Sequence, residues 1–248
     1  MKRSLFITIL AALSAIAAAA QPPICMEEGA VLEYAILNGK GKPMGYIKST
    51  VDAVEQSDTC TLVTLMDCTY DKNREPSEEG DEFTVYRVGE SHMSWPVQDA
   101  FGSIIPSLSV IPDLDAYMRN QQAAFTKGES GSTVIVIPYD AEPGTMLPSY
   151  KYWEKYTKIG IDQAKLEVAV IPKFMGRETV KTAAGEFDCI VIHYDMDFNI
   201  EIMAQFQGEK MTMVEWRAPG IGVVKSGAID KKGDVVEGSV ELQKIVRP

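Results

Sequence analysis

The feature that most constrains the fold is a period-two alternation of apolar and polar side chains. It recurs in QAKLEVAVIP (163–172), FNIEIMAQF (198–206) and VVEGSVELQKI (235–245). Successive side chains of an extended strand point to opposite faces, so each segment has one apolar face and one polar face. This pattern is typical of half-buried strands in an antiparallel sheet that has one face in water.

Turn signals separate the strand-like segments at hairpin distances. NGKG (38–41) lies between two apolar runs, DKN (71–73) follows the run TLVTLMDCTY, and DKKGD (230–234) joins the last two strand-like segments. Gly, Asn and Asp tolerate the positive φ angles that tight hairpin turns need. Hairpins that follow one another in this way predict a mainly β fold, a single antiparallel meander sheet of roughly ten or eleven strands, rather than βαβ units.

Two stretches interrupt the meander. REPSEEGDE (74–82) is predicted to be an acidic loop, and residues 96–131 form an irregular insertion. The insertion contains DLDAYMRNQQAAF (113–125), the best candidate for a helix in the chain. We expect the insertion to pack against an open face of the sheet; a functional lid is the alternative.

Residues 1–20 have the pattern of a secretory signal peptide. Lys2 and Arg3 precede an apolar run that ends in four alanines. We predict cleavage after Ala20 and a single β-rich domain over residues 21–248; a retained N-terminal anchor is the alternative. Lipidation of Cys25 is not expected, because Ile24, and not a small residue, precedes that cysteine.

The mature chain is expected to be exported and to have no transmembrane segment. No later apolar run approaches the roughly 20 residues of a membrane-spanning helix. The predicted location is therefore the periplasm, the outer membrane surface or the extracellular space.

The acidic charge of the chain excludes one class of partner. The full sequence has 24 basic and 35 acidic residues, a net charge of −11, and removal of Lys2 and Arg3 with the signal peptide brings it to −13. Binding of phosphate groups depends on Lys and Arg, so no nucleic-acid partner is expected, and anionic lipid headgroups are repelled.

The four cysteines, Cys25, Cys60, Cys68 and Cys189, all lie after the predicted cleavage site. An exported protein meets conditions in which disulfides form, but four cysteines allow three pairings and the sequence does not choose among them. Cys60 and Cys68 lie in one strand-like run, roughly 26 Å apart if it is extended, which is beyond disulfide reach. Each of these two is expected to pair elsewhere or to stay reduced.

The segment GEFDCIVIHYD (185–195) carries residue types used in catalysis, but its spacing argues against it. On a strand, Cys189 and His193 share a face and lie roughly 13 Å apart. A nucleophile and its base must approach within about 3 Å. We therefore interpret the segment as the second arm of a hairpin that turns at Ala183, Ala184 and Gly185, buried on both faces.

Metal and cofactor chemistry is also not expected. His193 and Asp195 lie on one face roughly 7 Å apart and would need ligands from another strand to hold zinc. The acidic stretch matches EF-hand ligand positions, but Pro76 takes the place of the required glycine. GESGS (128–132) and GIGVVKSG (220–227) lack the final glycine of a nucleophile elbow and the third glycine of a dinucleotide-binding loop, respectively. No catalytic, cofactor-binding or metal-binding residues are predicted, and the chain is not expected to be an enzyme.

Several segments resemble the TapB-like group of exported bacterial proteins of unknown activity. The resemblance covers most of the mature chain except residues 96–131 and is carried by GAVLEYAILNGKGKPMGY (29–46), PGTMLPSY (143–150), GRETVKTAAGEFDC (176–189) and VEWRAPGIGVVKSGAIDKKGD (214–234). It implies a relation to domain-of-unknown-function families with a lipoprotein-carrier-like half-barrel, in which a curved antiparallel sheet wraps a helix or an apolar cavity. Members often carry a cysteine in the strand after the acidic turn, where this chain has FTVYRVGESHMSW (83–95) and none.

These observations lead to one functional hypothesis and one alternative. The chain is expected to be a non-enzymatic protein of the cell envelope that holds an apolar or lipid-like ligand on the concave face of its sheet. The alternative is a structural or protein-interaction module of the envelope that binds no small ligand.

Overall fold

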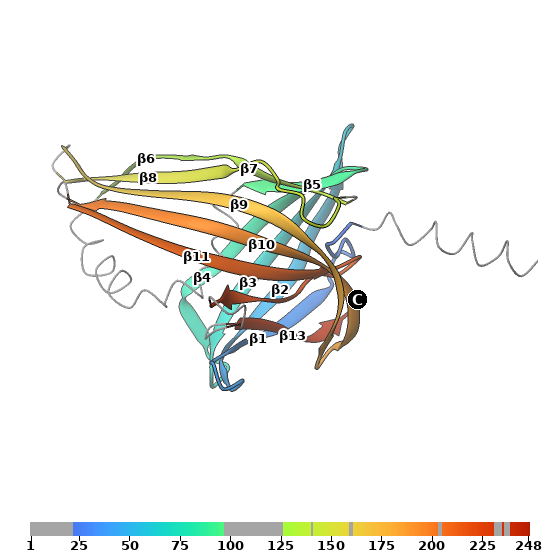
Figure 1. The fold of residues 1–248 in the computed structure, drawn as a ribbon. Coiled ribbons are helices and arrows are strands. Elements are labelled where there is room, and N and C mark those ends of the chain that lie inside the picture. The colour runs from blue at the N-terminus through green and yellow to red at the C-terminus, as the bar shows by residue number, and fades with distance from the viewer. Residues whose placement is uncertain are drawn as a thin grey trace, which may run out of the picture.

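A computed structural model describes residues 22–96, 126–139, 141–158, 161–202, 205–230, 235 and 239–248. The described residues form one antiparallel sheet of thirteen strands (Figure 1). The strands are β1 (Val31–Leu37), β2 (Pro43–Gln56), β3 (Thr61–Asp71), β4 (Pro76–Val88), β5 (His92–Pro96), β6 (Thr126–Ser132), β7 (Val134–Pro138), β8 (Tyr150–Lys158), β9 (Ile161–Thr182), β10 (Gly185–Ile202), β11 (Gln205–Ala218), β12 (Gly222–Ile229) and β13 (Ser239–Val246). The predicted fold class, a single curved antiparallel sheet in a mainly β protein, is confirmed.

The sheet consists of two meanders joined through the first and last strands. Strands β1 to β5 are neighbours in sequence order, and so are β8 to β13. Strand β13 pairs with β1, with Val31 opposite Val246 and Leu37 opposite Ser239. The two ends of the folded chain therefore lie side by side in the middle of the sheet, and neither contributes an open edge there.

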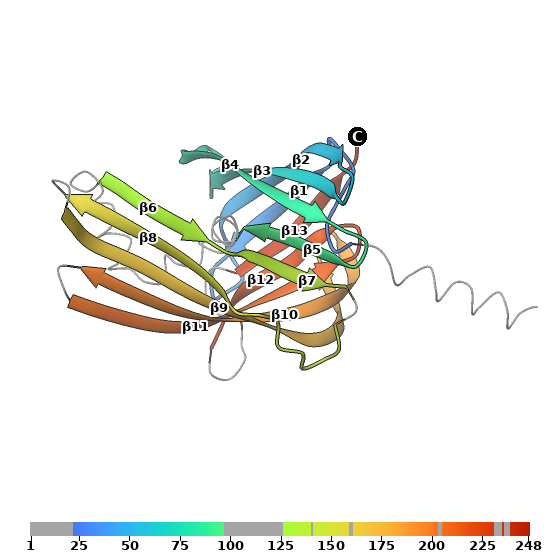
Figure 2. The same cartoon turned by 90° about the horizontal axis from the view of Figure 1, so that it is seen from above.

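Strands β6 and β7 bring the two edges of this sheet together. They are consecutive in sequence, with only Thr133 between them, but β6 pairs with β8 and β7 pairs with β5. One continuous stretch of chain thus begins at one edge and ends at the other. The result is a nearly closed barrel, from which the long strands β8 to β11 extend to the left in Figures 1 and 2.

A tyrosine side chain completes the closure where β8 separates from β7. The Tyr150 hydroxyl accepts a hydrogen bond from the Val136 amide at 3.0 Å and donates one to the Val136 carbonyl oxygen at 3.2 Å. Just beside it, the Thr133 amide donates to the Lys151 carbonyl at 2.9 Å. The hydroxyl therefore takes the place of the backbone partner that Val136 would have in a continuous sheet.

The β9–β10 hairpin forms the longest wall of the barrel. Its turn is Ala183–Ala184, and Gly185, at φ 144°, begins β10, as the sequence predicted. Gly176 lies opposite Val191 and Phe174 opposite Ile192, so Met175 is an extra residue in β9. This bulge bends the hairpin, and its tip curls around the end of the barrel in Figure 1.

The core fills the concave side of the sheet with large side chains from every part of the chain. Trp95 of β5, Tyr194 and Phe198 of β10, and Leu242 of β13 are each at most 2 % exposed. On β10 the inward set alternates with His193 and Asp195, which face outward, while Cys189 and Val191 are covered as well. The prediction that residues 185–195 are buried on both faces therefore holds for residues 189–192 and not for the rest.

Two turn predictions are confirmed in detail. In the 38–41 turn the Asn38 side chain accepts hydrogen bonds from the amides of Lys40 and Lys42 at 2.9 and 3.0 Å. In the 71–73 turn Asp71 accepts from the amides of Asn73 and Glu75 at 2.7 and 2.9 Å.

Other details of the sequence prediction need correction. The acidic stretch 74–82 is not a loop, because β4 begins at Pro76 and pairs with β3. The insertion 96–131 includes strand β6 from residue 126, and the helix predicted over 113–125 lies outside the described residues, as does most of the 230–234 turn. The described strands number thirteen, more than expected.

Replacing Tyr150 with phenylalanine tests the closure. The change removes the hydroxyl that bonds Val136 and leaves an amide and a carbonyl without that partner. We expect a loss of about 1–3 kcal/mol in the free energy of unfolding, the cost of unsatisfied buried backbone groups. Urea unfolding measures it. Tyr46→Phe, on the outer face, is the control, because its ring keeps the stacking with Arg74; equal stability of the two variants would contradict the assignment.

Candidate functional site

A buried ion pair lies inside the barrel on strand β11. Glu215 and Arg217 are two residues apart, so both point to the concave side, and they are 3 % and 2 % exposed. Arg217 Nε donates to Glu215 Oε2 at 2.8 Å. Charged groups enter a protein interior at high cost, and this cost is offset only when they are paired and hydrogen-bonded.

Aromatic side chains complete the surroundings of the pair. The Tyr194 hydroxyl of β10 donates to the same Glu215 oxygen at 2.8 Å. The Arg217 guanidinium lies over the Trp95 ring at 5.0 Å, and the Trp95 and Tyr86 ring centroids are 5.4 Å apart. Burial raises the pKa of Tyr86 to about 12, so its hydroxyl stays protonated at neutral pH. Four strands, β4, β5, β10 and β11, thus meet at one polar cluster in the core.

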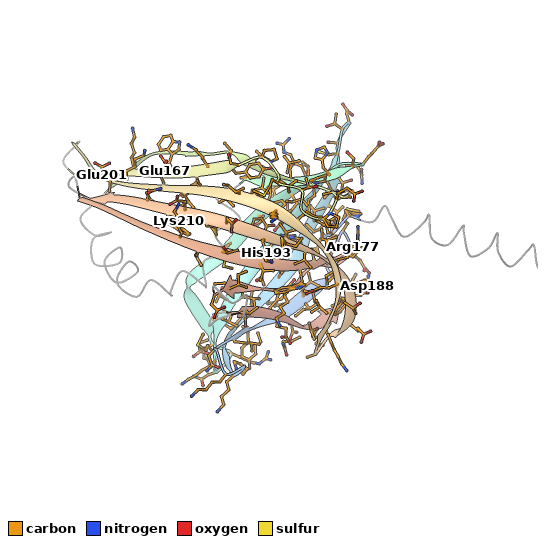
Figure 3. All side chains as sticks on the ribbon, viewed as in Figure 1. Glu167, Arg177, Asp188, His193, Glu201 and Lys210 are labelled. Atoms are coloured by element: carbon orange, nitrogen blue, oxygen red, sulfur yellow. The ribbon has the colours of Figure 1, made fainter. Side chains whose placement is uncertain are left out.

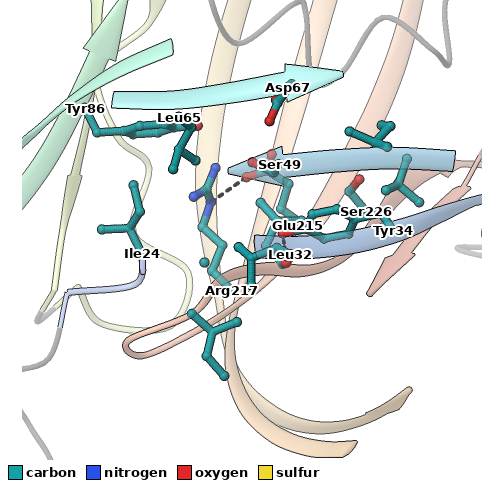
Figure 4. Close-up of a pocket in the computed structure, with 15 residues that line it drawn as sticks. Ile24, Leu32, Tyr34, Ser49, Leu65, Asp67, Tyr86, Glu215, Arg217 and Ser226 are labelled. Carbon is teal, nitrogen blue, oxygen red and sulfur yellow. Dashed lines mark hydrogen bonds and ion pairs between the residues drawn. The ribbon is translucent and has the colours of Figure 1, made fainter. Parts of the chain in front are cut away.

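A cavity opens beside this cluster (Figure 4). The space that the centres of water molecules can reach has a volume of about 60 Å³, which holds several water-sized groups. Its walls combine aliphatic side chains with the polar cluster, and they are formed by Ile24, Leu32, Tyr34, Ile47, Ser49, Leu65, Asp67, Tyr86, Glu215, Arg217, Ile221, Gly222, Val223, Ser226 and Val240. An apolar interior with a few convergent polar groups is the usual composition of a small-molecule site.

Asp67 of β3 is the least satisfied polar group in this wall. Its Oδ1 atom is buried and has no hydrogen-bond partner among the described residues. Ser49 lies directly opposite on β2 and hydrogen-bonds the carboxyl group, while Glu82 lies opposite on β4. Burial raises the pKa of Asp67, Ser49 lowers it and the Glu82 charge raises it further, with a net increase.

The segment before β1 covers part of the cavity. Ile24 is 2 % exposed and belongs to the cavity wall, and Cys25 is 3 % exposed. The Cys25 amide donates to the Ile221 carbonyl at 3.1 Å, and the Gly220 amide donates to the Pro22 carbonyl at 2.8 Å. The chain that immediately follows the predicted cleavage site is therefore held against the β11–β12 turn, and the Cys25 thiol lies inside the protein.

The residues that the sequence singled out lie elsewhere and do not come together as a catalytic group. His193 is on the outer face of β10, opposite Lys173 of β9. Figure 3 labels it on that strand. Asp195 accepts a hydrogen bond from Thr212 at 2.7 Å. Cys189 is fully buried, its thiol contacts the Phe187 carbonyl at 3.5 Å, and burial raises its pKa to about 12. The thiol is thus protonated at neutral pH and is a poor nucleophile.

The described residues contain no group of three or more His, Cys, Asp or Glu side chains that could hold a metal ion. All four cysteines lie in described segments, and none forms a disulfide bond. Cys60 immediately precedes β3 and Cys68 lies within it, which agrees with the expectation that these two do not pair with each other.

Sequence reasoning missed the Glu215–Arg217 pair. The run MTMVEWR (211–217) places Met211, Met213, Glu215 and Arg217 on one strand face. On that pattern alone the charged end belongs to a solvated face. One signal in the sequence could have found the pair. Glu215 and Arg217 are two residues apart and lie on the same strand face as Met213, and opposite charges on an otherwise apolar face can neutralise each other inside a protein.

The fold and site define a class of protein: an antiparallel sheet curved into a nearly closed barrel around a small, partly polar cavity. The chain belongs to the DUF3108-like family, a domain of unknown function, whose model matches residues 112–242. This confirms the predicted membership of a family without known activity. Comparison with curated protein sequences finds no match.

Two crystal structures share the fold. One is of a Bacteroides fragilis NCTC 9343 protein that is inferred to be exported and described as having a YmcC-like fold; it is 20% identical, with a TM-score of 0.64, over 92% of this chain and 100% of that chain. The other is of a Parabacteroides distasonis ATCC 8503 protein inferred to be a lipoprotein, 13% identical, with a TM-score of 0.62, over 92% and 99%. Among the described residues of this chain, no helix has the length and apolar character needed to cross a membrane.

Removing one member of the ion pair is expected to destabilise the protein far more than removing both. Arg217→Met leaves the Glu215 carboxylate buried without its cation, at a cost of about 3–5 kcal/mol in unfolding free energy. Adding Glu215→Gln removes that charge and keeps an acceptor for Tyr194, so the double variant should recover most of the loss. Urea unfolding of Arg217→Met, Glu215→Gln and the double variant gives the coupling energy between the two side chains.

An exposed pair provides the control. Lys210 and Asp197 interact at 3.0 Å with the Lys210 side chain 81% exposed, and Lys210→Met is expected to cost less than about 1 kcal/mol. Additive effects of the two interior substitutions would show that the pair does not act as a unit.

The raised pKa of Asp67 predicts a pH-dependent stability difference. Because the folded-state pKa lies above the unfolded value of 3.8, the protonated acid favours the folded state; this stability is fully present below the unfolded pKa and is lost as pH rises through the folded pKa. Asp67→Asn cannot titrate. We expect the variant to gain stability relative to the wild type as pH rises from about 4 towards 7, in urea unfolding at a series of pH values.

Asp58→Asn, at an exposed turn, is the control for the loss of one carboxylate at the surface. A stability difference between Asp67→Asn and the wild type that does not change with pH would refute the assignment.

Proposed function

We propose that the chain is an exported, non-enzymatic protein of the cell envelope that binds an apolar or lipid-like ligand on the concave face of its sheet. The observation that carries the proposal is the interior cavity, whose wall contains the aliphatic side chains of Leu32, Ile47 and Leu65 together with the buried ion pair. Such a site takes up an apolar group by the hydrophobic effect, and the cluster orients whatever polar group the ligand carries.

The size of the cavity limits how the ligand binds. A volume of about 60 Å³ admits one end of a chain molecule and not a whole lipid. The remaining part of such a ligand would lie outside this cavity. Binding of one end in a preformed pocket needs only local repacking of the core.

The non-enzymatic part of the proposal rests on how the interior charges are used. Glu215 already accepts hydrogen bonds from both Tyr194 and Arg217, an arrangement that stabilises its charge. Both bonds are made to Oε2, and together with the ion pair they hold the carboxylate in one orientation. The geometry of the pair therefore suits a fixed electrostatic role in the cavity wall.

Export is proposed from the sequence and from the proteins that share the fold. Residues 1–20 have the signal-peptide pattern, and we propose that residues 21–248 form one domain in the periplasm, at the outer membrane or outside the cell. The two similar structures come from proteins inferred to be exported or lipoproteins. Membership of the TapB-like group stays a prediction. The buried thiol of Cys25 argues against a lipid anchor at that residue.

A protein-interaction module is the second candidate, favoured by apolar side chains on the outer face. Phe83 and Val85 of β4 are 56% and 39% exposed, while Thr84 and Tyr86 between and beside them are buried. Phe83 lies opposite Met66 of β3. A protein partner that covers these side chains would make the chain an interaction module of the envelope that needs no small ligand.

A matched pair of variants on strand β3 tests ligand binding. Leu65 lines the cavity, whereas Leu62 is an odd number of residues away and faces the other side of the sheet. Leu65→Phe should fill the cavity and abolish binding, and Leu62→Phe should leave it unchanged. Native mass spectrometry of protein purified gently from its own envelope reports whether a small molecule is retained.

We expect the wild type and Leu62→Phe to carry a bound molecule and Leu65→Phe to carry none, with all three folded by circular dichroism. Wild-type protein that is always free of ligand would favour the second candidate function.

A further inference from the structure

The polar groups of the cavity are unequally satisfied. Glu215 accepts two hydrogen bonds, the Tyr34 hydroxyl donates to the Val223 carbonyl at 2.9 Å, and Arg217 Nε is engaged by Glu215. Asp67 Oδ1 is buried in the same wall and has no partner among the described residues. A buried acceptor without a partner costs free energy, and a hydrogen-bond donor placed in the cavity would recover that cost.

The charge of the cavity wall also selects the ligand. Its charged residues are Asp67, Glu215 and Arg217, so two acidic groups face one basic group. Glu82 lies directly opposite Asp67 on the neighbouring strand and adds negative potential at that end. An anionic head group would be placed among like charges, whereas a cation or a neutral donor would not.

We propose that the cavity recognises the polar end of its ligand through Asp67, and that this end is a hydrogen-bond donor, an ammonium or hydroxyl group on an apolar body, and not a carboxylate. The inference rests on the proposed function and names its ligand class. Ser49, directly across from Asp67, holds the carboxylate in place. The aliphatic side chains of Leu32, Ile47 and Leu65 surround the first carbons of the ligand.

Three probes with the same six-carbon chain and different ends test the proposal: hexylamine, hexan-1-ol and hexanoate at pH 7.5. Calorimetry gives the affinities, and the NMR resonance of the buried Arg217 Nε–H group reports binding in this cavity rather than elsewhere. We expect the affinity order amine, then alcohol, then carboxylate, because a charge-assisted hydrogen bond is roughly twice as strong as a neutral one.

Asp67→Asn keeps the shape of the side chain and removes its charge. We expect it to weaken hexylamine binding by about tenfold or more and to change hexanol binding by less than about threefold. Asp58→Asn, exposed in the β2–β3 turn, is the matched control and should change neither. The ranking of the three probes on wild-type protein does not depend on any variant, so it remains decisive if Asp67→Asn fails to fold.

The outcomes separate this proposal from the one on which it rests. If hexanoate binds as tightly as hexylamine, or if Asp67→Asn leaves the preference for the amine unchanged, the head-group assignment is wrong and the ligand-binding function stands. If none of the probes shifts the Arg217 resonance at millimolar concentration, both are overturned.

Discussion

The structure depends on bringing the two edges of one antiparallel sheet together. Strand edges carry rows of free amides and carbonyls, which proteins must pair, cover or protect. Here the continuous chain of β6 and β7 pairs with β8 at one end and with β5 at the other. Where these pairings diverge, the Tyr150 hydroxyl supplies both missing bonds to Val136. The curvature that makes this closure feasible comes from bulges such as the one at Met175 in β9.

Closure creates an interior that a flat sheet would not have. The side chains of β3, β4, β5, β10 and β11 converge there, and Glu215 and Arg217 are buried with a bond to each other, the Tyr194 hydroxyl as a second donor and the Trp95 ring beside the cation. The same convergence leaves a cavity that is lined by Ser49 of β2, Asp67 of β3 and the ion pair of β11. The ion pair and the cavity are therefore two results of one geometry, and neither is a property of a single strand.

Local patterns in the sequence predicted local structure well. Alternation predicted the long strands, and Asn38 and Asp71 marked turns that their side chains form as expected. The start of β4 was missed because its acidic sequence has no alternation of apolar and polar side chains. This part of the chain is a strand because it pairs with β3. Strand β6, with the sequence TKGESGS, likewise has no apolar face of its own. The site was missed because Glu215 and Arg217 become interior residues only when distant strands close around them, and no local pattern encodes that.

The unsatisfied carboxylate of Asp67 links stability to ligand binding. Asp67 is a net cost to the folded state at neutral pH, since burial and the Glu82 charge both disfavour its ionised form. An apolar residue in its place would pack against Leu65 and Tyr86 without that cost. A ligand that binds the folded protein alone raises stability with its concentration, and a donor that meets Oδ1 adds to this by removing the desolvation penalty. Retaining a destabilising group inside the barrel is thus understandable if the relevant state of the protein is the ligand-bound one.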